Sequence, residues 1–161
     1  MARKQKSTSG VGAYDAALKY LTPKARTVRE VEMKLDEGNY SEGEIMMTIE
    51  RLTDAGLLDD EKYARDFVES RLAAKPISKF RLSEQLRGHF VPQSIIEEVL
   101  SEVDEATESA NAADIAAKFL RQFAGVEDEE EKLRRVYTRL RTRGFDHDTI
   151  MAAIRSAVEN G

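Results

Sequence analysis

The sequence has 161 residues, of which 41% are hydrophobic and 34% are charged, and its formal net charge is −5. It contains no Cys, which excludes disulfides, thiolate metal sites and cysteine nucleophiles. No apolar run approaches the roughly 18 residues that a membrane-spanning helix needs, and the net negative charge argues against simple coating of DNA. Residues 1–12 are basic and polar without the apolar core of a signal peptide, so we expect a disordered basic tail.

The chain behind this tail is expected to be helical. The first helix is predicted over 13–21, where apolar residues recur at helical spacing on one face. Thr27 with Glu30, and Ser41 with Glu44, match the capping box that opens a helix. Two further helices are therefore predicted after these positions, which completes a first group of three.

Two more groups of three helices are predicted further along the chain. Their first helices are expected over 61–72 and 112–123, and helix pairs are expected within 78–100 and 131–158. Asp146 is a good N-cap for the last helix. No segment alternates with period two over a useful length, so no strand is expected.

The second and third helices of each group share an ordered set of residues that indicates an internal repeat. The set is Leu, Gly, an aromatic and Ile, found as Leu35, Gly38, Tyr40 and Ile45, as Leu86, Gly88, Phe90 and Ile95, and as Leu140, Gly144, Phe145 and Ile150. The Gly is expected to adopt the left-handed conformation that ends a helix, and the aromatic is expected to fill the corner behind it.

We therefore expect an all-α protein in which three tandem three-helix units form an elongated, curved array. Behind the tail at 1–12, the predicted units are 13–60, 61–107 and 108–161. Neighbouring units either stack to bury a shared core or touch little and flex. The acidic stretch 101–109 is the expected hinge.

No catalytic or metal-binding arrangement is found in the sequence. His89 and His147 each lack a second His at metal-ligand spacing. The adjacent Asp59 and Asp60 could suggest acid–base or metal chemistry, but Asp60 as the N-cap of the next helix explains them more simply. We therefore expect no enzymatic activity, no cofactor and no bound metal.

Basic side chains are the stronger candidates for function. Segment 132–143 carries six bases and no acid, whereas 97–131 carries twelve acids and two bases. Because bases recur on the same helix of each unit, they could form a track for DNA phosphates or for an acidic protein groove; a merely solubilising surface is the alternative. The predicted partner-binding residues are Arg29, Lys34, Lys75, Lys79, Arg81, Arg87, Lys132, Arg135, Arg139 and Arg143.

The ordered set of motifs resembles the RecX family of bacterial regulators of the RecA recombinase. The resemblance runs from about Ala13 to the end of the chain. It rests on Leu58-Asp59-Asp60, Tyr63-Ala64, Phe67 and Arg71, on Leu82 to Leu86 with Arg87-Gly88 and Ile95 to Leu100, and on Leu140, Arg143-Gly144-Phe145 and Ile150. Two places depart from the family pattern: residues 74–77 replace a turn that often contains Gly, and His89-Phe90 replaces a small apolar step.

The resemblance implies a non-enzymatic, cytoplasmic regulator in DNA repair and the SOS response. Such a protein binds the RecA–DNA filament and limits its extension or promotes its disassembly, so ATP hydrolysis, strand exchange and co-protease activity fall. It is expected to act as a monomer and to bind single-stranded or double-stranded DNA weakly. The alternatives are a helical DNA-binding protein that acts through phosphate contacts and an unrelated helical adaptor.

Overall fold

The computed structural model describes residues 12–161, and over this range the chain forms nine α-helices and no strand. The all-α prediction is confirmed. Residues 1–11 of the predicted basic tail lie outside the described part. No helix among the described residues is both long enough and apolar enough to cross a membrane.

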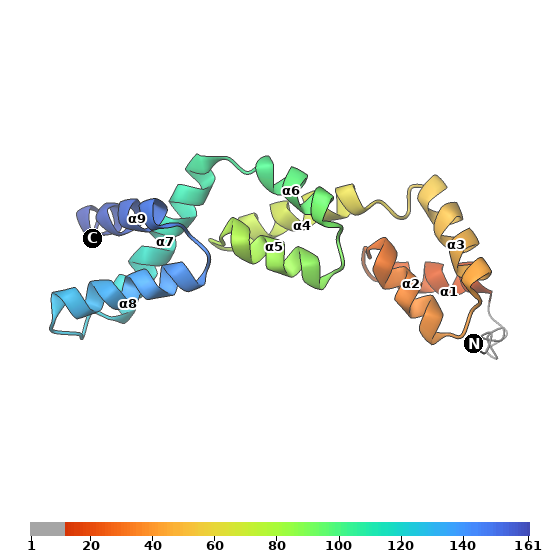
Figure 1. The fold of residues 1–161 in the computed structure, drawn as a ribbon, viewed down its shortest axis with the longest axis horizontal. Coiled ribbons are helices and arrows are strands. Elements are labelled where there is room, and N and C mark those ends of the chain that lie inside the picture. Colours follow the sequence, from red (N-terminus) through yellow and green to blue (C-terminus); the bar gives the residue numbers. More distant parts are fainter. Residues whose placement is uncertain (1–11) are drawn as a thin grey trace. The chain divides into compact units, whose positions relative to one another are not determined.

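The helices follow one another in three groups of three (Figure 1). The first group is α1 (Ala13–Leu21), α2 (Val28–Glu37) and α3 (Glu42–Asp54). The second is α4 (Asp60–Ala74), α5 (Lys79–Gly88) and α6 (Gln93–Ser101). The third is α7 (Glu105–Gln122), α8 (Glu129–Thr142) and α9 (His147–Glu159). The tandem three-helix repeat is therefore confirmed, while the curvature of the array stays a prediction.

Capping residues set most of the helix starts. Both predicted capping boxes are present, at Thr27 for α2 and at Ser41 for α3, and the Asp146 carboxylate caps α9. Helix α7 begins at Glu105, earlier than the predicted start, because the Asp104 carboxylate accepts a hydrogen bond from the Thr107 N–H at 2.7 Å. The stretch predicted as a hinge thus includes the first turn of a helix.

The described chain divides into two compact units that do not follow the predicted repeat boundaries. One unit contains residues 12–66 and 86–96, and the other contains 67–85 and 97–161. Each unit therefore holds one complete terminal repeat and part of the middle one. The middle repeat contributes buried side chains to both, with Leu86 and Ile96 in the first unit and Leu82 and Val99 in the second. The division into 13–60, 61–107 and 108–161 stays a prediction.

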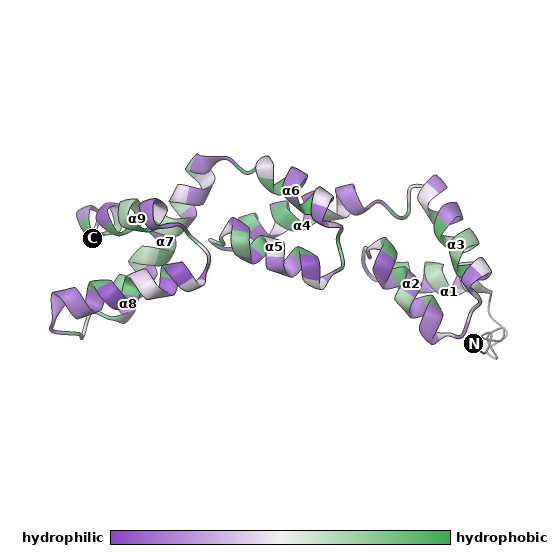
Figure 2. Ribbon diagram, in the orientation of Figure 1, coloured by the Kyte–Doolittle hydropathy of each residue, from purple (hydrophilic) through white to green (hydrophobic). Residues whose placement is uncertain are grey.

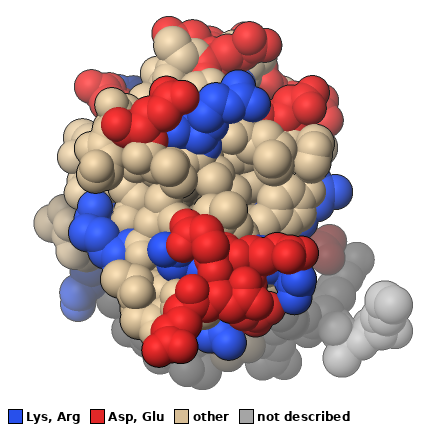
Figure 3. All heavy atoms as spheres, turned by 90° about the vertical axis from the view of Figure 1, so that its left-hand side faces the viewer, with Lys and Arg blue, Asp and Glu red and all other residues tan. Residues whose placement is uncertain are grey.

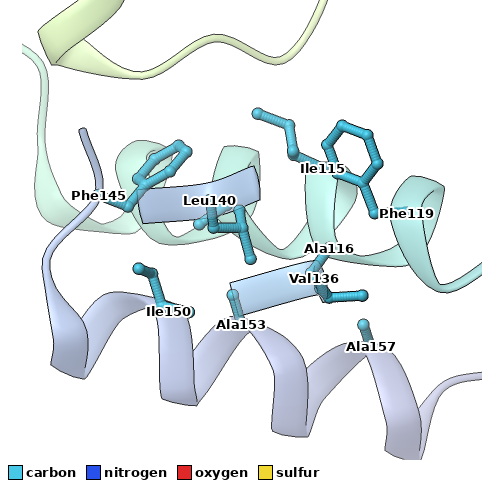
Figure 4. Packing of buried hydrophobic residues seen from close by; sticks show 10 residues of the cluster. Ile115, Ala116, Phe119, Val136, Leu140, Phe145, Ile150, Ala153 and Ala157 are labelled. Carbon is cyan, nitrogen blue, oxygen red and sulfur yellow. The ribbon is translucent and has the colours of Figure 1, made fainter. Parts of the chain in front are cut away.

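The core of the third repeat is a closed cluster of apolar side chains from three helices. The cluster contains Ile115, Ala116 and Phe119 of α7 and Val136 and Leu140 of α8 (Figure 4). Phe145, Ile150, Ala153 and Ala157 complete the cluster from the segment that leads into α9 and from α9 itself. Burying a Leu, Ile or Phe side chain contributes about 1.5–3 kcal/mol, so a cluster of this size can stabilise the repeat.

The first repeat has an equivalent cluster. Ala17 of α1 packs with Val31 and Leu35 of α2 and Leu52 of α3, and all four are essentially inaccessible to solvent. The opposite faces of these helices are polar, so each helix shows both hydrophobic and hydrophilic residues along its length (Figure 2). This is the amphipathic pattern from which the helices were predicted.

The turn between the second and third helices is the same in all three repeats, but the sequence predicted its left-handed residue correctly only in the third. The left-handed residues are Asn39 (φ 61°), Phe90 (φ 63°) and Gly144 (φ 89°). Gly38 and Gly88 were wrongly assigned this conformation, because the left-handed residue comes one position after Gly38 and two after Gly88. In each turn the next N–H donates to the carbonyl of the repeated Leu, which is the Schellman arrangement that closes a helix end.

The corner side chain of the middle repeat was also misassigned. Tyr40 and Phe145 are buried as predicted, but Phe90 is 47% exposed and Val91 is buried in its place. The reason is the shared turn: Val91, like Tyr40 and Phe145, follows the left-handed residue and points into the core. The same one-residue shift makes Ile96, rather than Ile95, the buried residue that corresponds to Ile150.

Candidate functional site

A pair of hydrogen bonds holds the start of α5 against the third repeat. The Ser78 hydroxyl donates to the Arg143 carbonyl oxygen at 2.5 Å, and the Lys79 N–H donates to the Glu108 carboxylate at 3.1 Å. Ser78 is also buried and accepts a hydrogen bond from the Arg81 N–H, so it caps α5 while it contacts the neighbouring repeat. Asn111 of α7 adds a third bond, to the Ile77 carbonyl oxygen. These contacts fix Arg81 and Arg143 beside each other.

The same arrangement holds the start of α2 in the other unit. The Thr27 hydroxyl donates to the His89 carbonyl oxygen at 2.7 Å, and the Val28 N–H donates to the Asp60 carboxylate at 3.0 Å. Asp60 was predicted to be the N-cap of α4, which is wrong. Asp59 accepts the capping bond from the Lys62 N–H, so Asp60 is the first residue of the helix and is available for α2.

A basic cleft lies where α5 meets the third repeat. It has a volume of about 340 Å³ and lies between the turn before α5, the face of α5 and the side of α7. Its polar lining consists of Lys75, Ser78, Arg81, Gln85, Asp114, Lys118 and Arg143. Four cationic side chains thus share the cleft with one carboxylate, and this excess of positive charge makes it the candidate site.

The Arg143 guanidinium of the cleft lies close to other cationic side chains. Burial lowers the pKa of the Arg143 guanidinium, and the neighbouring charges of Arg81 and Arg139 lower it further. Arg81 forms an ion pair with Glu84 at 3.4 Å. Within residues 12–161 no carboxylate lies within ion-pair distance of Arg139 or Arg143. The cleft therefore offers positive charge that a negatively charged group can neutralise.

Two phenylalanine rings support these cations. The Arg143 guanidinium lies 4.6 Å from the centre of the Phe119 ring, and the Arg139 guanidinium lies 5.8 Å from the same centre. Phe119 stacks on Phe123, with ring centres 6.1 Å apart. A cation over an aromatic face is stabilised by about 0.5–2 kcal/mol and keeps its full charge. The rings thus orient the arginines without neutralising them.

The predicted basic stripe of α8 divides into two parts. In its first half Lys132 pairs with Glu129 at 2.7 Å and Arg135 pairs with Glu131 at 3.0 Å. In the second half, Arg143 lines the cleft, and Arg139 lies close enough to Arg143 for its charge to lower the pKa of Arg143. Acidic and basic side chains likewise lie close together on the end of the molecule drawn in Figure 3. The usable positive charge is therefore concentrated near the cleft rather than spread along α8.

The remaining predicted partner-binding residues lie elsewhere. Arg29 pairs with Glu32 at 3.3 Å, and Lys34 lies 5.4 Å from the centre of the Tyr20 ring. Arg87 donates to the Gln93 side chain at 3.1 Å. The Lys79 backbone binds Glu108, as described above. Of the ten predicted residues, the structure places Lys75, Arg81 and Arg143 in the cleft and Arg139 near Arg143, and the roles of all ten stay predictions.

Four polar residues of the cleft were missed by the sequence analysis, namely Ser78, Gln85, Asp114 and Lys118. Lys118 belongs to the first helix of its repeat, where no basic track was expected. Its spacing from Ile115 and Phe119 places it beside the apolar face of α7, but nothing local indicates that the turn before α5 lies opposite. Gln85 also lines the cleft, and its buried Oε1 atom has no hydrogen-bond partner. Such an atom gains from a ligand that supplies a donor.

The two histidines have local roles in packing. His89 Nδ1 lies 3.3 Å from a Glu30 carboxylate oxygen, and its ring lies against Tyr63. His147 Nδ1 lies 3.0 Å from the Tyr137 hydroxyl. Among the described residues no group of His, Asp or Glu is arranged to hold a metal ion. The arrangement of the cleft suits binding of an anionic group through charge-assisted hydrogen bonds.

These features define a class: an all-helical protein of tandem three-helix domains with a basic cleft. Two family models match the chain, described as the first three-helix domain of RecX over residues 13–52 and the second three-helix domain of RecX over residues 59–100. They coincide with the helices of the first two repeats.

Comparison with individual proteins gives the same assignment. The chain is 34% identical over 148 residues to "Regulatory protein RecX" of Prosthecochloris aestuarii, covering 92% of this chain and 95% of that protein. It is 36% identical over 138 residues to the protein of the same name from Chlorobium phaeobacteroides, covering 86% and 88%. A crystal structure of RecX from Lactobacillus salivarius matches with a TM-score of 0.84 at 25% identity, covering 91% of this chain and 95% of that one. The chain belongs to the RecX family of regulatory proteins.

Proposed function

We propose that this protein binds the RecA–DNA filament and inhibits the recombinase without catalysing a reaction itself. Inhibition would come from limiting filament extension or promoting disassembly, which lowers ATP hydrolysis, strand exchange and co-protease activity. The protein would act in the cytoplasm as a monomer and would need no cofactor. Membership of a family of regulatory proteins supports the regulatory part of this proposal.

The basic cleft is the observation that carries the choice of partner. Burial and the neighbouring charges of Arg81 and Arg139 lower the pKa of Arg143, so these guanidinium groups lie close enough to repel one another. A nucleoprotein filament presents both phosphates and acidic side chains, either of which would relieve this repulsion. Contacts with several subunits of the filament at once would add avidity to individually weak bonds.

The primary test is the ATP hydrolysis of the cognate recombinase on single-stranded DNA. The protein is titrated well below one copy per recombinase subunit. A steep loss of hydrolysis at this low ratio is expected, because one bound regulator would affect a filament of many subunits. Full hydrolysis at every ratio, with an active recombinase, would exclude the proposal.

A matched pair of variants tests the site. Within residues 12–161, Arg139→Gln removes an unpaired charge near Arg143 of the cleft, whereas Arg134→Gln removes a charge from the same helix that is already paired with Glu131 at 2.8 Å. We expect Arg139→Gln to weaken inhibition by several-fold to about tenfold and Arg134→Gln to leave it nearly unchanged, since paired surface charges contribute little. Equal effects would remove the cleft from the interface.

Direct binding of DNA through phosphates is the second candidate function. The excess of positive charge in the cleft favours it, because Arg recognises phosphate oxygens well. Fluorescence anisotropy with labelled DNA should then show binding that weakens steeply as salt increases. If inhibition of the recombinase persists at a salt concentration that abolishes this binding, the dominant contact is with protein.

A further inference from the structure

The first repeat carries a groove that the basic cleft does not involve. It lies between α2 and α3 and has a volume of about 680 Å³. Its α2 lining comes from Arg29, Glu32, Met33, Asp36 and Glu37, and its α3 lining comes from Glu42, Ile45, Met46 and Ile49. Both sets recur at spacings of three and four residues, so each forms one continuous helix face. The groove is thus bounded by two helix faces.

The bottom of the groove is apolar and adaptable. Ile45 and Ile49 are partly buried and pack against the core of the repeat. Met33 and Met46 remain 37% and 68% exposed beside them. Methionine is flexible and polarizable, and exposed methionines are common on surfaces that bind varied apolar side chains. An exposed apolar strip of this kind in a helical groove is typical of a protein-binding surface.

The rim of the groove is acidic. Four carboxylates line it, from Glu32, Asp36, Glu37 and Glu42, together with a single guanidinium, that of Arg29. Arg29 is itself paired with Glu32 at 3.3 Å. Within residues 12–161, neither Glu37 nor Glu42 forms an ion pair. The rim therefore attracts cations and repels phosphates, in contrast to the basic cleft.

We propose that this groove binds a basic amphipathic helical segment of a partner protein. The methionines and isoleucines would receive its apolar side chains, and the rim carboxylates would pair with its Lys and Arg residues. A nucleic acid is disfavoured by the acidic rim. A second copy of this chain is disfavoured as well, because its basic amphipathic helix α8 already buries Val136 and Leu140 in its own core. The proposal does not depend on the proposed recombinase function.

The test uses a synthetic peptide in which Leu residues and Lys residues each repeat at helical spacing, so that they form opposite faces of a helix. A matched peptide has Glu in place of Lys. The protein carries ¹³C-labelled methionine methyl groups, and its spectrum is followed during titration. We expect the Met33 and Met46 signals to shift and saturate with the Lys peptide only. Met151, which is 42% exposed on α9, is an internal reference that should not shift. Equal shifts at Met151, equal binding of the Glu peptide, or no saturation would overturn the proposal.

A pair of variants separates the groove from general attraction between the acidic chain and a cationic peptide. Glu37→Gln with Glu42→Gln removes two charges from the rim, and Glu129→Gln with Glu130→Gln removes two from the start of α8. The rim variant should weaken binding on the order of tenfold and the α8 variant less than twofold, because short-range pairs dominate at physiological salt. Circular dichroism confirms that both variants fold. Equal weakening by the two variants would show that net charge alone attracts the peptide.

Discussion

The two junctions that join consecutive repeats use the same hydrogen bonds but different side chains. At the first junction Thr27 donates to the His89 carbonyl and Asp60 accepts from the Val28 N–H. At the second, Ser78 donates to the Arg143 carbonyl and Glu108 accepts from the Lys79 N–H. Each junction thus combines a capping hydroxyl, a carbonyl one residue before a left-handed residue, and a carboxylate from the next first helix.

The difference between the junctions lies in what surrounds these bonds. The first is accompanied by His89, Glu30 and Tyr63 in contact with one another. The second adjoins the basic cleft, where Arg81 and Arg143 lie together. The repeated part holds neighbouring repeats in register, and the varied part determines which ligand can bind. The following changes test whether the two junctions are equivalent in stability.

The largest effect is expected from Gly144→Ala. The residue has φ of 89°, and an added Cβ would overlap the side chain of Phe80. The left-handed conformation costs about 1–2 kcal/mol for a residue with a side chain, and overpacking adds about 1–3 kcal/mol. Urea unfolding should therefore show a loss of roughly 2–4 kcal/mol. Combining it with Phe80→Ala should recover the overpacking part, and an unchanged midpoint for the single variant would refute the packing argument.

Removal of the junction hydroxyls should have the next largest effect. Ser78→Ala and Thr27→Ala each lose an N-cap bond and leave a carbonyl of the next repeat without its donor. The expected loss is about 1–3 kcal/mol for each variant, measured by urea unfolding. Ser78→Thr is the control, because it keeps a hydroxyl and introduces the residue type found at the first junction. A loss at only one junction would show that the two are not energetically equivalent.

The junction carboxylates are expected to have a smaller effect on the free energy of unfolding, and this effect depends on pH. Burial raises the pKa of both Asp60 and Glu108, although the backbone hydrogen bonds oppose this shift. Because the pKa is raised in the folded state, the carboxyl group contributes its full stabilisation at pH values below its ordinary pKa, which is near 4.5 for Glu108. This stabilisation is lost as pH rises through the pKa of the folded state. Glu108→Gln keeps an acceptor for Lys79 but cannot titrate.

The measurement is the free energy of unfolding of wild type and Glu108→Gln between acidic and neutral pH. The free energy of unfolding of Glu108→Gln should increase relative to that of the wild type as pH rises. Glu108→Ala, which lacks the acceptor, should be less stable than the wild type at every pH. If the wild type instead became more stable relative to Glu108→Gln as pH rises, the pKa of Glu108 would not be raised in the folded state.

The smallest effect is expected at Phe90. This residue occupies the left-handed position that Asn39 and Gly144 occupy in the other repeats, and its side chain is 47% exposed. Phe90→Gly removes the strain and little packing, so we expect a gain of up to about 1 kcal/mol in thermal or urea unfolding. A loss of stability would indicate that the exposed ring makes contacts that outweigh the strain.

The fold was largely predictable because helices and their starts depend on local chemistry. The capping boxes at Thr27 and Ser41 and the N-cap at Asp146 were predicted from sequence and confirmed. The errors arose where the repeats were aligned on residue type. Gly88 and Phe90 matched the expected Gly and aromatic, but the backbone turn places Phe90 at the left-handed position and Val91 in the core.

The candidate site was predictable only in part. Arg81, Arg139 and Arg143 were recognised because bases recur on the second helix of each repeat. Lys118 was not, since its position in the cleft depends on how the turn before α5 meets α7. The role of Asp60 was missed for the same reason: its partner, the Val28 N–H, is distant in the sequence.

The junctions have a consequence for the hydrogen-exchange kinetics of the backbone. The N–H groups in the first turn of a helix have no partner within the helix and usually exchange rapidly with solvent. Those of Val28 and Lys79 are bonded to carboxylates of the following repeat. Their exchange should therefore be slow, and its rate should report separately how often each junction opens while the helices themselves remain folded.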